Sequence, residues 1–397
     1  MVSSLRKAFN EQFTAEKYEA FLKDLHSLHP GDIEFRVCET PVFVDKTFTD
    51  KLMHACESIV DVICDDDFLK LTENAIPPGE KVPNEAKISH MISFDFGVCI
   101  NDQGELEPQL IEMQGFPTLY AFQVYYPEIV EKHFSIPSNY SHYLNDYTKE
   151  TYLEMLRKLI VGDLQKEQVI LLEINPDEQK TRIDFRCTKD YLGIETVNLT
   201  DLIREDKKLY YINNGIKTEI KRIYNRIIFD DFKANRASLG NVVDITADLD
   251  VEWVPHPNWF YRISKYTLPY INHQFVPQTF FLNEVKQLPD DLEHYVLKPL
   301  FSFAGQGVKI DVTKEDIDAI EDPENYILQR KVRYADVIET PDVPAKVEIR
   351  MMYVWLEGDA RPHAAVNLAR MSKGKMIGVR YNKDKEWVGG TVAYFEQ

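Results

Sequence analysis

Apolar residues recur at two different spacings along the chain, and the spacing changes from region to region. Up to about residue 70 they recur every three or four positions, as Tyr18, Phe21 and Leu25 do, and this spacing predicts helices. Residues 92–100 and 108–113 are instead strand-like runs separated by turn-forming residues. We therefore expect an antiparallel hairpin here, followed by a helix.

From about residue 140 helix-like and strand-like stretches alternate. Helices are expected over residues 149–164 and from residue 179 onward, and strands at 169–174, 194–197 and 222–229. Strands that alternate with helices are typical of parallel sheets. The pattern therefore predicts a small parallel α/β lobe.

The last third of the chain mixes short strands with short helices. Helices are expected around 263–271 and 314–320, and strands at 295–298, 326–332, 347–356 and 364–371. We place three regions along the chain: residues 1–140, 141–258 and 259–397. The expected fold class is α/β.

Composition narrows the kinds of partner and compartment. The 397 residues are 44% hydrophobic, which is enough for two or three packed lobes. The net charge of −19 disfavours nucleic acid and anionic membranes as partners. The five cysteines form no CxxC pair, and no run of about 18 apolar residues occurs. We expect a cytoplasmic protein with reduced thiols.

Residues 295–308 (YVLKPLFSFAGQGV) combine a strand-borne lysine with a glycine loop. Backbone amides at Gly305 and Gly307 can approach phosphate oxygens, and Lys298 supplies a cation. The spacing does not match a P-loop. Lys265 lies upstream, and the strand that ends near Gln329 follows. A surface turn and a solvated lysine remain the alternatives.

The early hairpin carries oxygen-bearing side chains suited to a metal ion. Alternation places Glu112 and Gln114 on one face of their strand, and Asp95 lies on the preceding strand. Carboxylate and amide oxygens are ligands that Mg²⁺ accepts. A rival Glu-x-Asn motif, Glu173 and Asn175, lies in a run that is apolar on both faces, as an internal parallel strand is.

The order of these motifs resembles the ATP-grasp superfamily over roughly residues 260–397. With the metal hairpin placed early, the whole chain resembles a circularly permuted ATP-grasp enzyme of the eukaryotic glutathione synthetase type. Glutathionylspermidine synthetases are more distantly similar. The resemblance implies a metal-binding hairpin within 1–140, a substrate-binding lobe at 141–258, and a nucleotide-binding region at 259–397 with a lid at about 274–335.

By this resemblance Lys265 and Lys298 hold the phosphates of ATP, and a loop with Ser302, Gly305 and Gly307 closes over them. Gln329, Lys331 and Val332 would contact the base. Apart from the resemblance, Glu348 and Arg350 alternate on one strand with Met352, which suits a ribose or phosphate contact. Asp95, Glu112 and Gln114 would hold Mg²⁺. The chain departs from the family pattern at Gln114, where an asparagine is usual, and at Ser302, where a further metal-binding glutamate stands.

A third departure concerns the substrate. Ser93 stands where the glutathione enzymes carry a substrate-binding arginine, which argues against glutathione precursors. The remaining substrate candidates are two arginines and a group of small or amide residues near the C-terminus. They are Arg226, Arg350, Asn382, Gly389, Gly390 and Thr391, while Arg370 is expected to stabilise the transferring phosphoryl group. For each arginine a structural salt bridge is an open alternative.

The expected activity is an ATP-dependent carboxylate–amine ligase that acts through an acyl-phosphate. Its cofactors would be ATP and Mg²⁺, and its partners a small-molecule carboxylate and an amine. The resemblance leaves a homodimer open. A small-molecule kinase on the same fold and a catalytically inactive ATP-binding protein are the alternatives.

Overall fold

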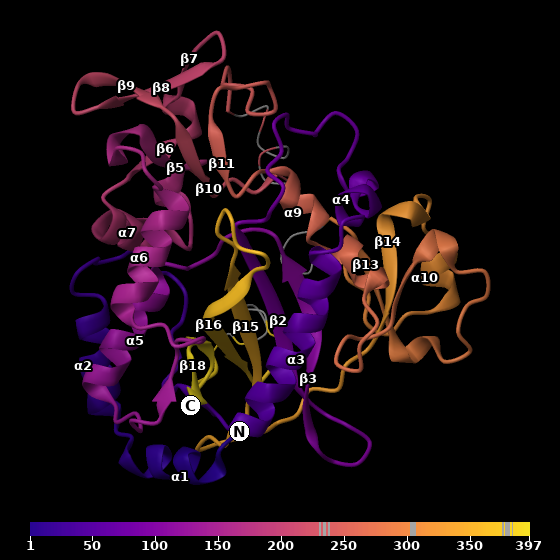
Figure 1. Ribbon diagram of the computed structural model, residues 1–397. Helices are drawn as coiled ribbons and strands as arrows, with labels where there is room; N and C mark the ends of the chain where they lie inside the picture. The colour runs from indigo at the N-terminus through magenta and orange to yellow at the C-terminus, as the bar shows by residue number, and fades with distance from the viewer. Residues whose placement is uncertain are drawn as a thin grey trace.

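A five-stranded antiparallel sheet forms the centre of the molecule in the computed structural model, which describes residues 1–229, 232, 236, 239–301, 307–374, 377, 382 and 384–397. Its strands, in spatial order, are β17 (Gly389–Thr391), β16 (His363–Ser372), β15 (Lys346–Val354), β2 (Met91–Ile100) and β3 (Leu106–Gln114). The expected hairpin at 92–113 is β2 and β3. The sheet joins this early hairpin to strands from the last eighth of the chain (Figure 1).

The central sheet has one apolar and one charged face. Phe94 and Phe96 of β2 and Ile349 of β15 pack in one cluster with Leu52 and Ile59 of α3 (Lys46–Ile63). Because side chains alternate across a strand, the residues between them point to the opposite face. That opposite face carries the ionisable residues described in the next section.

The predicted parallel lobe is present. Its strands, in spatial order, are β11 (Glu252–Val254), β10 (Arg222–Asn225), β5 (Val169–Glu173) and β6 (Glu195–Asn198), and all pair in parallel. Leu171 packs in one apolar cluster and Leu172 in another, so β5 is covered on both faces. Helices α6 (Lys149–Ile160) and α7 (Arg182–Leu192) contribute to the first of these clusters.

A third, small sheet lies beside the central one (Figure 1). Its strands, in spatial order, are β12 (Thr279–Phe281), β14 (Tyr326–Arg330) and β13 (Tyr295–Pro299). Along the chain, α10 (Lys314–Asp318) lies between β13 and β14. Leu282, Leu297 and Leu328 form its own core. This sheet carries Lys298.

The remaining elements close the ends of the molecule. They are α1 (Ser3–Gln12), α2 (Ala15–Leu25), α4 (Phe68–Leu71), α5 (Phe122–His133) and α9 (Asn258–Arg262), with the strands β1 (Val42–Val44), β4 (Tyr140–Ser141) and β18 (Ala393–Glu396). The helix expected after the hairpin is α5. The termini lie close together (Figure 1), and β1 pairs in parallel with β18.

The structure corrects, refines or adds to the local expectations at four places. The N-terminal 70 residues are interrupted by β1, because this three-residue segment pairs with the distant C-terminal strand. The short helix expected around 263–271 is present as a 3₁₀ helix, η5 (Lys265–Tyr270), with Pro269 inside it. The strand expected at 222–229 ends at Asn225. A hairpin sheet of β7 (Ile203–Glu205), β8 (Lys208–Asn213) and β9 (Ile216–Ile220) was not anticipated.

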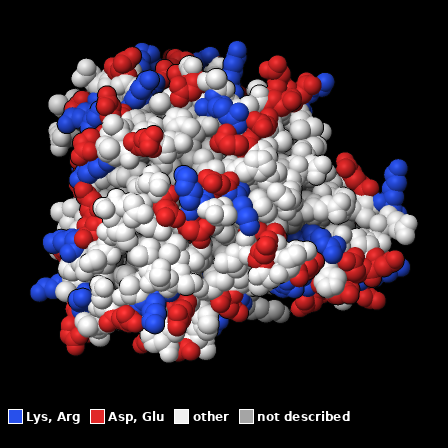
Figure 2. Space-filling model, turned by 60° about the horizontal axis from the view of Figure 1, so that its bottom comes forward, with Lys and Arg blue, Asp and Glu red and all other residues white. Residues whose placement is uncertain are grey.

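The surface shown in Figure 2 intersperses acidic and basic side chains without one continuous basic region on that face. None of the helices in the described part of the chain is long and apolar enough to span a lipid bilayer.

The contact of β3 with α9 can be tested at Gly115. A Cβ there would lie 2.4 Å from the Trp259 carbonyl oxygen, so Gly115→Ala requires backbone movement. We expect a loss of about 2 kcal/mol of unfolding free energy, measured by urea denaturation. Gly390→Ala is the control, because its Cβ would meet the Phe35 ring at 3.5 Å and the Arg36 carbonyl oxygen at 3.8 Å, both ordinary contact distances. Equal stabilities for the two variants would contradict the packing described.

Candidate functional site

The charged face of the central sheet is organised around the Asp95 carboxylate. Asp95 stands opposite Arg350 in the β2–β15 register and is 2% exposed. Arg350 donates to both carboxylate oxygens, from Nε to Oδ1 at 2.5 Å and from Nη2 to Oδ2 at 2.7 Å. Arg370 donates from Nη2 to Oδ2 at 2.9 Å. Burial opposes ionisation, but the two arginine charges outweigh it and keep the pKa of Asp95 below its ordinary value.

Glu348 continues this network on β15. Arg370 Nη2 donates to Glu348 Oε2 at 2.8 Å, and the Tyr334 hydroxyl donates to Oε1. Gly97 lies opposite Glu348 in the sheet, and a Cβ at Gly97 would come within 2.7 Å of the Tyr334 ring. The glycine therefore makes the room in which Tyr334 reaches the carboxylate. Burial, with the nearby charge of Asp95, raises the pKa of Glu348 despite Arg370.

Lys298 is held where the small sheet meets the central one. The β2–β3 register shifts after Asp95, and the carbonyl of Ile111 in this irregularity accepts from Lys298 Nζ at 3.3 Å. Gln329 Oε1 accepts from the same ammonium at 2.6 Å. Burial, reinforced by Lys265, lowers the pKa of Lys298 to about 8, although Glu112 acts in the opposite sense.

Two cavities border the charged face and share part of their walls. The lysine cavity, about 530 Å³, is lined by Glu112, Gln114, Lys265, Leu300 and Phe301 among others. The glycine-loop cavity, about 680 Å³, is lined by Phe35, Leu368, Met371, Gly389 and Gly390 among others. Both linings include Thr118, Lys180, Thr181, Arg350 and Arg370. The two guanidiniums therefore stand where the cavities meet.

Of the nucleotide residues expected from the sequence, Lys265 lines the lysine cavity and donates to the Leu300 carbonyl at 3.3 Å. Gln329 is buried between Lys298 and Thr279, to which its amide donates at 3.1 Å. Lys331 pairs with Asp311 at 2.8 Å, and Val332 follows it half-buried.

The expected closing loop is described only in part. Ser302 and Gly305 lie outside the described residues. Gly307 has a φ of +73°, and a Cβ there would meet the Pro299 ring at 2.9 Å, so the chain requires glycine at this position.

The expected substrate residues separate into two groups. Arg350, Asn382, Gly389 and Gly390 line the glycine-loop cavity. Ser93 is fully buried in β2, and the Thr391 hydroxyl donates to the Thr40 carbonyl at 2.7 Å.

Arg226 lines the lysine cavity, but its guanidinium is buried and pairs with Asp184. Burial opposes its charge, yet Asp184 holds the pKa of Arg226 above its ordinary value. The carboxylate that Arg226 clamps here is therefore one of the protein's own.

The fit to Mg²⁺ differs among the three expected ligands. Both oxygens of Asp95 accept hydrogen bonds from guanidiniums, which leaves this carboxylate neutralised by protein cations. Glu112 and Gln114 line the lysine cavity and present oxygens of the type that Mg²⁺ prefers. Glu173, from the rival motif, lines the same cavity. Within the described residues, no group of three or more His, Cys, Asp and Glu side chains is arranged to hold a metal ion.

Several residues of the site carried no signal in the sequence. Phe35 and Arg36 lie in an irregular segment, and Tyr334 follows a strand without any motif of its own. Gly389 marks the place where the Arg36 backbone approaches β17: its φ is +122°, and a Cβ would lie 2.3 Å from the Arg36 carbonyl oxygen. A glycine pair so close to the C-terminus indicated a tight backbone approach, but not the partner segment.

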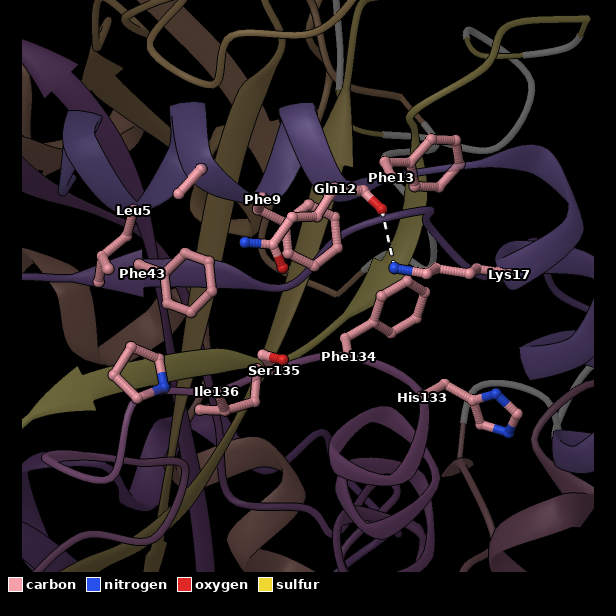
Figure 3. Close-up of a pocket in the computed structure, with 12 residues that line it drawn as sticks. Leu5, Phe9, Gln12, Phe13, Lys17, Phe43, His133, Phe134, Ser135 and Ile136 are labelled. Atoms are coloured by element: carbon pink, nitrogen blue, oxygen red, sulfur yellow. Dashed lines mark hydrogen bonds between the residues drawn. The ribbon is translucent and has the colours of Figure 1, made fainter.

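A separate hollow of about 260 Å³ lies between α1 and the segment after α5 (Figure 3). Its walls include four phenylalanines, of which Phe9, Phe43 and Phe134 face one another. Lys17 donates to the Gln12 carbonyl at 3.0 Å. This described lining has one lysine and no arginine. The charged face of the central sheet, which carries Arg350 and Arg370, is therefore the better candidate site.

Comparison with known proteins places the fold. No family model matches the chain, and no curated protein sequence does either. Among solved structures the chain is similar to a glutathione synthetase-like effector (GSS30) from Globodera pallida in its apo form. The two are 11% identical with a TM-score of 0.59, over 97% of this chain and 98% of that one. The likeness shows a mixed α/β, glutathione synthetase-like fold along nearly the whole chain.

The Asp95 network predicts a large effect of removing its charge. Asp95→Asn removes the carboxylate that pairs with the buried Arg350 and one of the two that pair with Arg370. We expect a loss of about 3 kcal/mol of unfolding free energy. Urea denaturation at pH 7 measures it. Asp102→Asn, at the exposed β2–β3 turn, is the matched control and should leave the midpoint unchanged. A stable Asp95→Asn variant would show that the ion pairs do not form.

Lys298 predicts a pH dependence of stability. Its pKa of about 8 lies below the ordinary 10.5, so between these values the unfolded chain binds more protons and stability rises with pH. From pH 8 to 10 this contribution is on the order of 2 kcal/mol. Lys298→Met should abolish it, whereas Lys314→Met, at the exposed start of α10, should retain it. Parallel pH profiles of unfolding free energy for all three proteins would refute the assignment.

Proposed function

We propose that this protein is an ATP-dependent ligase that joins a carboxylic acid to an amine through an acyl-phosphate. The observation that carries the proposal is the meeting of two cavities at Arg350 and Arg370. A ligase of this kind must bring a nucleotide and a second substrate together at one phosphoryl group. The glutathione synthetase-like fold is consistent with this activity.

The lysine cavity suits the nucleotide phosphates. Lys265 lines it, and Lys298 lies close enough for each ammonium to affect the other. A bound polyphosphate would relieve this repulsion and raise the lowered pKa of Lys298, so that both lysines bind it as cations. Phe301 and Leu300 cover part of the wall and would exclude water from the phosphates.

The chemistry requires an anion to approach another anion, and the arginines reduce that repulsion. A carboxylate oxygen of the acid attacks the γ-phosphorus, and the bond from that phosphorus to the ADP oxygen breaks. The amine nitrogen then attacks the acyl carbon, phosphate leaves, and the nitrogen loses a proton. Arg370 and Arg350, oriented by Asp95, would hold the acid and the developing charge in place.

Magnesium, if bound with the nucleotide, would neutralise phosphate charge, and Glu112 and Gln114 are the residues suited to hold it. Asp95 is reserved for the arginines in this proposal.

The test is a coupled assay of ADP release with ATP, Mg²⁺, a panel of carboxylic acids, and hydroxylamine as a general amine acceptor. We expect ADP release to require both the acid and hydroxylamine, and a hydroxamate to form. Lys265→Met should lower the rate roughly 10²-fold by removing a phosphate-binding cation. Lys17→Met, in the remote aromatic hollow, is the control and should retain the rate.

Other outcomes separate the alternatives. A phosphorylated acid formed equally well without hydroxylamine, and stable to it, would indicate a kinase. ATP binding without ADP release for any acid in the panel would indicate a nucleotide-binding protein without ligase activity.

A further inference from the structure

We infer that the acid substrate is an aliphatic carboxylic acid whose apolar body occupies the glycine-loop cavity. The inference rests on the proposed function, because it names the acid that such a ligase would activate. The cavity has an apolar wall contributed by residues from separate parts of the chain. Its apolar members are Phe35, Leu119, Leu368, Met371, Ile377 and Val388.

The apolar wall and the cations are adjacent on one face of one sheet. Leu368 stands directly opposite Arg350 in the β15–β16 register, and Arg370 follows two residues later on the same face. An acid bound against Leu368 therefore has its carboxylate at the guanidiniums. Each guanidinium carries five N–H donors, and the bonds to Asp95 and Glu348 use only Nε and Nη2 of Arg350 and Nη2 of Arg370.

Several polar side chains of this cavity are already bonded to the protein. Arg36 Nη1 donates to the Val388 carbonyl at 2.6 Å and to Glu39 at 3.0 Å. Asn382 bonds to Ser372, and Lys385 Nζ donates to the Lys373 carbonyl at 2.8 Å. A polar substrate body would lose its water shell against Leu368 and Met371 without equivalent hydrogen bonds. An aliphatic body loses nothing there.

The departure at Ser93 agrees with this assignment. Ser93 is fully buried, and its neighbour across the β2–β15 ladder is Met352 rather than a charged residue. The guanidinium beside Asp95 comes instead from β15, as Arg350. The cationic end of the substrate site thus faces the apolar cavity bounded by β16.

The experiment is calorimetric titration of the full chain, without ATP, with butanoate, hexanoate and octanoate. Each buried methylene should lower Kd about fourfold. Hexanol, which lacks the carboxylate, and glutamate, which has a charged body, should each bind at least tenfold more weakly than hexanoate. An affinity independent of chain length, or tighter binding of glutamate than of hexanoate, would overturn the inference.

Two variants locate the binding. Leu368→Gln should weaken octanoate severalfold and butanoate much less, while Arg350→Met should weaken both equally. Lys17→Met is the control for the aromatic hollow and should change neither. Unchanged binding in Leu368→Gln and Arg350→Met, or loss in Lys17→Met, would place the acid elsewhere. If Leu368→Gln does not fold, the chain-length series on the unaltered protein still decides.

The outcomes also separate the inference from the ligase proposal. If octanoate binds as described but no acid supports ADP release, the ligase proposal fails and the acid-binding site stands. If ADP is released with glutamate and not with octanoate, the ligase proposal stands and the assignment of the acid fails.

Discussion

The buried Asp95 carboxylate is the interaction on which the rest of the site depends. It lies at the centre of a sheet, where a single unpaired charge would be very costly, and it is neutralised by Arg350 and Arg370 together. Those two guanidiniums are in turn fixed in position by the carboxylate. Because they border both cavities, one ion-pair network sets the geometry where the lysine cavity meets the glycine-loop cavity.

The network is possible because the central sheet is built from distant parts of the chain. Asp95 comes from β2, Arg350 from β15 and Arg370 from β16, and their antiparallel register places them side by side. Helix α3 covers the apolar face, so the charged face is left to the cavities. Small residues complete the arrangement: Gly97 admits Tyr334, and Gly389 admits the Arg36 backbone.

The two cavities differ in the charge and polarity of their linings, and each therefore suits a different kind of ligand. The lysine cavity is lined by Lys180 and Lys265 together with the carboxylates of Glu112 and Glu173. The glycine-loop cavity has an apolar wall and shares Lys180, Arg350 and Arg370 with its neighbour. The other two cations of its described lining, Arg36 and Lys385, are bonded to groups of the protein. Polyanions and apolar acids are therefore favoured on opposite sides of the same arginines. A site of this kind would orient an acid by holding its carboxylate at the arginines and its apolar body in the glycine-loop cavity.

The sequence alone determined most strands and longer helices, because alternation and helical spacing are local properties: the β2–β3 hairpin, α5 and the parallel lobe follow from them. It also named Asp95, Glu112, Glu348, Arg350 and Arg370, which share one sheet face. What it could not determine was which strands are neighbours. Only the pairing of β2 with β15 makes Arg350, rather than a metal ion, the partner suited to Asp95. The pairing of β1 with β18 was not predicted for the same reason, because it depends on contacts between residues hundreds of positions apart.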